Sequence, residues 1–246
     1  MIHTTDYVLD DEARVRALVR EHGWATLVSV TADGPVASHV PILLEEPAPD
    51  AAPGTSEHRP SARPRRDRHG LPDRFSTPAA PFTVLSHLGR PDEVLHEIGS
   101  GRESLLIVEG PYGYVSPGWY GYTPAVPTWN YVAAHLYGTV ELLDPEESYA
   151  VMAATVDRYE APMPEPVRMP DPDVAGYARR IAPGAVGLRL RVDRWQGKAK
   201  LSQDKPREVA ERVARALRDD PHYAEPGLAA EMRAELARRV DPAPEG

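Results

Sequence analysis

The part of the sequence best suited to chemistry is an aromatic run between Gly110 and Gly138. Aromatic residues make up only 7% of the chain, yet eight fall within this run: Tyr112, Tyr114, Trp119, Tyr120, Tyr122, Trp129, Tyr131 and Tyr137. The prolines and glycines between these rings favour rigid, flat walls with polar edges. Such walls suit a planar ligand, for example a flavin, a porphyrin or a base. The alternative is a core cluster beneath a crossing loop.

A second candidate for binding is the segment Gly197 to Arg207, which reads GKAKLSQDKPR. Lys198 and Lys200 are two residues apart, so on a strand their side chains face the same side. Ser202 and Gln203 follow them with further hydrogen-bonding groups. Two ammonium groups beside hydroxyl and amide donors can hold a phosphate or a propionate. A solvated strand end is the alternative.

Three histidines, His39, His87 and His135, lie among apolar strand residues. In such a place a neutral imidazole is more often a hydrogen-bonded core residue than a ligand. His87, with Arg90 close behind it, is the best candidate for an axial iron ligand or a cofactor contact. The chain has no cysteine, so disulfides, iron–sulfur clusters and thiol catalysis are excluded.

Composition and motifs exclude several other classes of protein. The net charge of −9 argues against direct binding to DNA, because nucleic-acid binders usually carry a basic face. Motifs of nucleotide-binding loops, zinc proteases and nucleophile elbows are absent. No apolar run approaches the roughly 20 residues that span a bilayer, and no targeting segment is visible, which predicts no membrane partner and a cytoplasmic location.

The elements that must position these groups are mostly strands. Residues 24–31 and 35–44 predict a hairpin, because Asp33-Gly34 supplies the turn between them. Further strands are predicted at 82–88, 104–109, 112–116, 131–143 and 186–195. Helices are predicted at 11–22 and 91–98, after Asp144, and twice after Pro206. The pattern indicates a mainly β (α+β) fold, a small antiparallel barrel with flanking helices.

Residues 46–82 have a different composition, with eight prolines and six arginines. They contain too few aliphatic residues to offset the entropy lost on ordering. We therefore expect a disordered insertion within a cofactor-binding domain of residues 1–205, followed by a helical extension at 206–246. The arginines of the insertion could alternatively form a surface for an acidic partner.

The motifs resemble those of a known family. The matching elements are Gly110-Pro111 to Ser116-Pro117, Trp119-Tyr120, Val126-Pro127-Thr128-Trp129-Asn130-Tyr131, His135, Gly138, and Gly197-Lys198 to Pro206. In this order they resemble the PaiB-like proteins, described as FMN-binding negative transcriptional regulators. The resemblance runs from the first predicted helix to about Leu217, apart from the insertion.

This resemblance implies an FMN-binding split β-barrel like that of the pyridoxamine-phosphate-oxidase type, as a homodimer with the planar cofactor near the subunit interface. Carried onto this sequence, the residues of the cofactor site would be His87, Arg90, Trp119, Tyr120, Thr128, Trp129, Asn130, His135, Lys198, Lys200, Ser202 and Gln203. The element after His87 reads Leu-Gly-Arg-Pro-Asp-Glu and departs from the family pattern there.

A related branch, the piperazate synthases, binds haem b and closes an N–N bond in an N-hydroxylated amino acid. In that setting His87 would be the axial ligand. Three hypotheses follow: a flavin- or haem-binding regulatory or redox-sensing protein, a haem-dependent enzyme acting on a small molecule, or an interaction protein whose cofactor site has decayed. An absorption spectrum separates the first two.

Overall fold

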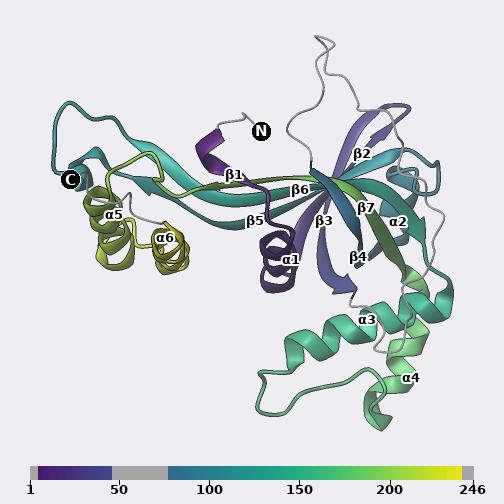
Figure 1. The fold of residues 1–246 in the computed structure, drawn as a ribbon. Helices are drawn as coiled ribbons and strands as arrows, with labels where there is room; N and C mark the ends of the chain where they lie inside the picture. The colour runs from purple at the N-terminus through teal and green to yellow at the C-terminus, as the bar shows by residue number, and fades with distance from the viewer. Residues whose placement is uncertain (1–4, 46–76, 240–246) are drawn as a thin grey trace. The chain divides into compact units, whose positions relative to one another are not determined.

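The computed structural model describes residues 5–45 and 77–239, and it confirms a mainly β fold with flanking helices (Figure 1). The strands are β1 Val8–Leu9, β2 Trp24–Thr31, β3 Gly34–Glu45, β4 Thr77–Gly89, β5 Glu103–Val115, β6 Thr128–Leu142 and β7 Ala185–Lys200. The helices are α1 Glu12–Glu21, α2 Arg90–Leu95, α3 Pro145–Glu160, α4 Pro172–Ile181, α5 Arg207–Asp219 and α6 Pro226–Arg238. Short 3-10 helices are η1 Thr5–Tyr7, η2 Pro117–Tyr120 and η3 Ala182–Gly184.

The strands form one seven-stranded sheet in the order β1-β7-β4-β3-β2-β5-β6. An additional pairing of β7 with β6 closes all the strands except β1 into a barrel. Gly138 allows this closure, because a Cβ at that position would collide with the backbone carbonyl of Arg191 in β7. The pairings whose registers are resolved are antiparallel, as the sequence predicted.

The chain forms two compact units. The barrel unit contains residues 12–108 and 135–196, and the second unit contains residues 1–11, 109–134 and 197–246. We call the second the lysine unit, because all three lysines of the chain lie in it. The helices predicted as a C-terminal extension, α5 and α6, pack within the lysine unit. No helix in the described ranges is long and apolar enough to cross a membrane.

In the barrel unit, alternating residues of the strands build the core. The β2–β3 hairpin has the predicted turn, with Thr31 paired to Gly34. The sequence Asp144-Pro145-Glu146-Glu147 predicts a helix start with a capping box, and helix α3 begins with one between Asp144 and Glu147. The three- and four-residue spacing of Tyr149, Met152, Val156 and Tyr159 predicts that these side chains face the core, but the buried residues of the helix are Ser148 and Val151. The Ser148 hydroxyl accepts a hydrogen bond from the Gly187 amide of β7 at 2.9 Å, so this side of the helix contacts the barrel.

Three further features of the secondary structure differ from the prediction. The segments 104–109 and 112–116 are one continuous strand, β5, because Gly110 and Pro111 lie within the ladder without ending it. Helix α4 was not predicted at all. Strand β4 begins at Thr77, inside the predicted insertion 46–82; residues 46–76 of that insertion lie outside the described residues.

Candidate functional site

The sheet of the lysine unit has one covered face and one open face. Gly113 of β5 packs against Leu217 of α5 and Leu228 of α6, and a Cβ added there would lie only 3.1 Å from Leu228. Asn130 of β6 faces the same helices and contacts Met232. Because strand residues alternate, the residues on either side of Gly113 and Asn130 point to the opposite, open face. These residues are Tyr112, Tyr114, Trp129 and Tyr131.

The two lysines of β7 meet the N-terminal segment. Strand β1 pairs with the end of β7, with Val8 opposite Lys198, and this pairing brings Tyr7 alongside. The Nζ atoms of Lys198 and Lys200 both lie 5.8 Å from the centre of the Tyr7 ring, so the two ammonium groups do share one side. Lys198 Nζ is also 5.6 Å from the Tyr131 ring, and Lys200 Nζ donates a hydrogen bond to the Thr128 hydroxyl. We call these five residues the lysine cluster.

The electrostatics of the lysine cluster favour an anion. Burial lowers the pKa of Lys200, and the neighbouring charges of Lys198 and Lys205 lower it further against the opposing effect of Asp204. That carboxylate is already engaged, because Lys205 forms an ion pair with it at 2.8 Å and Tyr7 donates a hydrogen bond to it. Burial and this hydrogen bond raise the pKa of Tyr7, which therefore stays a neutral donor. An added anion would relieve the excess positive charge.

A simple sequence signal marks this cluster. The chain has only three lysines, at positions 198, 200 and 205, whereas arginines are spread along its whole length. A lysine differs from an arginine in its compact charge and in how readily its pKa responds to burial. Their confinement to one short segment identifies the segment more specifically than the Lys-x-Lys spacing alone does.

Other predicted site residues hold the backbone of the turn that follows β7, next to the two lysines. Asn130 is fully buried and donates a hydrogen bond to the Ser202 hydroxyl at 2.9 Å. Ser202 has a φ of 63°, a conformation that L-residues adopt rarely. Gln203 closes the same turn by accepting from the Leu201 amide at 2.7 Å and donating to the Ala199 carbonyl at 2.6 Å. These three side chains position the end of β7.

Trp119 and Tyr120 lie in η2, which follows β5. Trp119 is half-buried, whereas Tyr120 is buried and stacks on Tyr122 with ring centres 5.7 Å apart. The Tyr120 carbonyl accepts a hydrogen bond from Arg212 of α5, and Lys205 lies 5.7 Å from its ring. Tyr120 therefore connects η2 to the lysine-bearing turn.

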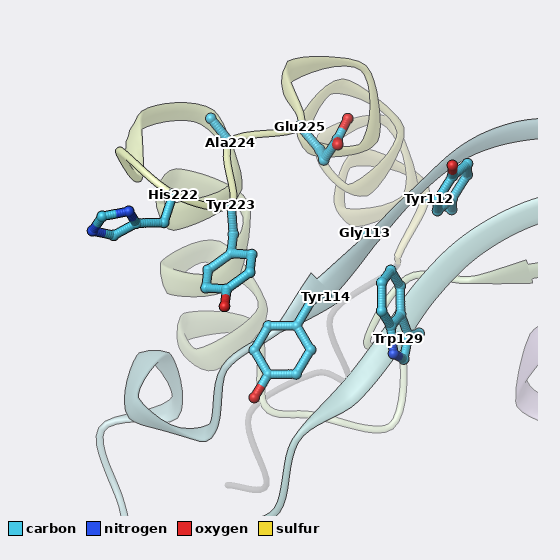
Figure 2. A pocket seen from close by; sticks show the side chains of 8 residues that line it. All are labelled: Tyr112, Gly113, Tyr114, Trp129, His222, Tyr223, Ala224 and Glu225. Atoms are coloured by element: carbon cyan, nitrogen blue, oxygen red, sulfur yellow. The ribbon is translucent and has the colours of Figure 1, made fainter.

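An aromatic pocket of about 360 Å³ lies at the edge of β5 (Figure 2). Its lining consists of Tyr112, Gly113, Tyr114, Trp129, His222, Tyr223, Ala224 and Glu225. Tyr114 lies 5.1 Å from Tyr223 and 6.0 Å from Trp129 between ring centres, so three rings converge on the pocket. Figure 2 shows the His222 imidazole turned away from these rings. The contribution of residues 220–225 could not be seen in the sequence, since the loop joins the strands only in three dimensions.

The remaining predicted residues, His87, Arg90 and His135, belong to the barrel unit. His87 is half-buried in β4, its Nδ1 is buried without a hydrogen-bond partner in the described residues, and burial lowers its pKa. Burial lowers the pKa of His135 as well. Arg90 forms an ion pair with Glu93 at 2.9 Å at the start of α2. Within the part of the chain that the structure describes, no group of three or more His, Asp and Glu side chains could hold a metal ion.

A histidine that sequence reasoning passed over, His96, is at the centre of a buried network in the barrel unit. It is 2% exposed; its Nδ1 lies 3.0 Å from the Ser29 hydroxyl and its Nε2 3.0 Å from that of Ser38. Ser38 donates to Asp92 at 3.1 Å, so it accepts from Nε2–H, and the neutral imidazole accepts from Ser29. The adjoining cavity of about 10 Å³ holds one water at most. This network is structural.

Comparisons with known proteins agree with the fold and the motifs. A model of the family described as "Putative FMN-binding domain" matches residues 1–194. The Protease synthase and sporulation protein PAI 2 of Bacillus subtilis is 22% identical over 222 residues, covering 90% of this chain and 91% of that protein. An uncharacterised protein of Emericella nidulans is 27% identical over 187 residues and covers 68% of each chain.

The solved structures that are similar to this chain include two from mycobacteria. The conserved hypothetical protein Rv2991 from Mycobacterium tuberculosis has a TM-score of 0.50 at 11% identity, covering 84% of this chain and 94% of its own. The FAD and Heme binding protein from Mycobacterium smegmatis has a TM-score of 0.49 at 16% identity, covering 82% of this chain and 77% of its own. At these identities the likeness concerns the fold alone.

Proposed function

Because this chain belongs to the FMN-binding family of PaiB-like proteins, we propose that it binds FMN, with the phosphate on the lysine cluster. The observation that carries the proposal is the pair of ammonium groups of Lys198 and Lys200 beside Tyr7. Lys200 is partly desolvated, and the nearby carboxylate of Asp204 is held by Lys205.

The chemistry of this cluster fits the phosphate of FMN. Two ammonium groups supply charge-assisted donors, and the hydroxyls of Thr128 and Tyr7 lie beside them as further polar partners. The turn held by Asn130, Ser202 and Gln203 fixes the end of the strand that carries both lysines. Such support from buried neighbours keeps a binding site in its working geometry.

The open aromatic face lies next to this cluster in the same unit. Tyr131 joins the two, because its ring lies near Lys198 while its strand neighbour two residues away, Trp129, belongs to the aromatic pocket. A bound flavin would supply redox chemistry, and the rings of Tyr7 and Tyr131, which lie beside the lysines and outside the aromatic pocket, would flank it. A regulatory or redox-sensing role, as in the family resemblance, would follow from the oxidation state of that cofactor.

The experiment that tests this function is an absorption spectrum of protein reconstituted with equimolar FMN and hemin and then desalted. We expect retained flavin bands in the blue and near-ultraviolet. A Soret band without flavin bands would overturn the FMN proposal.

Haem b with His87 as axial ligand is the second candidate. The buried Nδ1 of His87 has no hydrogen-bond partner in the described part of the chain, and the pKa of that imidazole is lowered. Both features favour haem, because an iron ligand must be a neutral, available nitrogen. On this alternative, which includes an N–N bond-forming enzyme, His87→Ala removes the Soret band. A Soret band that persists in His87→Ala would exclude this histidine.

We also propose that the protein is a homodimer. Trp24 and Val30 of β2 are 57% and 61% exposed, and Trp24 stacks on His39 of β3 on the same outer face of the barrel unit. An apolar sheet face of this kind is typical of a protein interface. A second copy is the occupant that the family resemblance suggests.

A further inference from the structure

The aromatic pocket has the opposite charge preference to the lysine cluster. Its lining contains one carboxylate, that of Glu225, and contains neither lysine nor arginine. The other chemically distinctive members are the rings of Tyr112, Tyr114, Trp129 and Tyr223. We propose that this pocket binds an organic ammonium cation.

The rings are arranged as walls of one pocket. Tyr114 is tilted by 46° to Tyr223 and stands edge-on to Trp129 at 74°, while Trp129 is tilted by 36° to Tyr112. Figure 2 shows Tyr114, Trp129 and Tyr223 grouped around the same space. The negative faces of such rings attract ammonium groups, and the attraction grows as the cation leaves water.

Glu225 is held in place at the pocket by its backbone. Its amide donates to the Leu217 carbonyl at 2.6 Å, and its carbonyl accepts from Ala229 at 3.0 Å. Its side chain packs beside Gly113, where an added Cβ would lie 3.1 Å from the Glu225 Cγ. The nearby N-terminus of α6 contributes roughly half a positive charge, which a full carboxylate exceeds. The pocket therefore stays attractive to cations.

The pocket has the size of a small-molecule site. Its volume of about 360 Å³ is at the lower end of known ligand pockets, enough for a compact apolar head such as a trimethylammonium group. The Glu225 carboxylate would repel a phosphate, so the flavin phosphate does not belong here. The proposed cation site goes beyond FMN binding and does not depend on it.

The test is calorimetric titration with choline and with 3,3-dimethyl-1-butanol, its neutral isostere, at low ionic strength. We expect choline to bind about tenfold more tightly, because only choline gains the charge interactions with the rings and Glu225. Equal affinity for the two compounds would overturn the proposal. So would the absence of choline binding at millimolar concentrations, which is the result expected if a second protein copy fills the pocket.

Variants assign the binding to this pocket. Glu225→Gln, Trp129→Leu and Tyr223→Leu should each weaken choline binding about two- to fivefold, whereas Tyr223→Phe, which keeps the ring, should not. Glu208→Gln, which removes a carboxylate on α5 outside the lining, is the control. Lys198→Met with Lys200→Met should leave choline binding intact, which separates this site from the FMN proposal. If choline binding were lost in that double variant and kept in Glu225→Gln, the assignment to the aromatic pocket would be wrong.

Discussion

Lys200 shows how surroundings give one residue its function. An exposed lysine is fully charged near neutral pH, but burial and two neighbouring lysines lower the pKa of Lys200. Its hydrogen bond to Thr128 keeps the ammonium group in place. A bound phosphate would offset the cost of keeping that charge partly buried.

This lowered pKa predicts a pH dependence of FMN binding. Binding needs the ammonium form, which is present below the pKa and lost as the pH rises through it. FMN affinity, measured by quenching of flavin fluorescence, should therefore fall on the alkaline side at a lower pH than an ordinary lysine would give. Lys200→Arg should reduce this fall, because a guanidinium does not titrate there. An identical pH profile in Lys200→Arg would contradict the role of Lys200.

The lowered pKa of His96 predicts how the stability of the folded protein depends on pH. Burial lowers its pKa, with Asp92 opposing, so the unfolded chain takes up the proton first. The stabilisation that the neutral His96 contributes is complete above about pH 6.5, the ordinary pKa of histidine. It is lost as the pH falls through the lower pKa of the folded state. The melting temperature should drop from about pH 7 to about pH 5. His96→Gln should reduce that drop, with the remainder due to His87 and His135, whose pKa values burial also lowers, and exposed His222→Gln should leave it unchanged; equal slopes in all three proteins would contradict this.

At the scale of elements, the closure of β6 on β7 depends on Gly138. A side chain there would meet the Arg191 carbonyl, so we expect Gly138→Ala to cost about 2–3 kcal/mol of unfolding free energy. Gly176→Ala is the matched control, because nothing lies near that position within α4 and alanine should stabilise the helix by about 0.5–1 kcal/mol. Urea denaturation measures both. An unchanged free energy of unfolding in Gly138→Ala would show that β6 and β7 do not approach each other so closely.

The element predictions succeeded where a pattern is local. The β2–β3 hairpin and the α3 cap follow from residues adjacent in sequence, and both were predicted correctly. The long strand β5 was divided in two, because Gly110-Pro111 suggests a turn when the neighbouring strand is unknown. Helix α4 was missed because prolines surround it and a glycine, Gly176, lies within it.

The candidate site could be predicted only in part, for a similar reason. Lys198, Lys200 and Thr128 could be proposed from spacing and family motifs, and they do lie together. Tyr7 could not be proposed, because the pairing of β1 with β7 that brings it there leaves no local pattern. His87 and His135 belong to the barrel unit, and their place in the cofactor site stays a prediction.

At the scale of the whole molecule, the dimer has a direct test. Sedimentation should give twice the 27.0 kDa mass of the chain. Trp24→Lys combined with Val30→Lys should yield monomers, because each buries a charge on the proposed apolar interface. Tyr177→Lys, a change of an exposed ring on α4, is the control. A monomer in the unaltered protein, or an unperturbed dimer in the double variant, would exclude this interface.

The account as a whole depends on an anion site formed by the paired lysines of β7. The most direct measurement compares the affinities of FMN and riboflavin, which differ only in the phosphate, for the unaltered protein and for Lys198→Met combined with Lys200→Met. We predict that the unaltered protein prefers FMN by at least about a hundredfold and that the double variant loses this preference. Equal affinity of the unaltered protein for both flavins, or an undiminished preference in the double variant, would contradict the account.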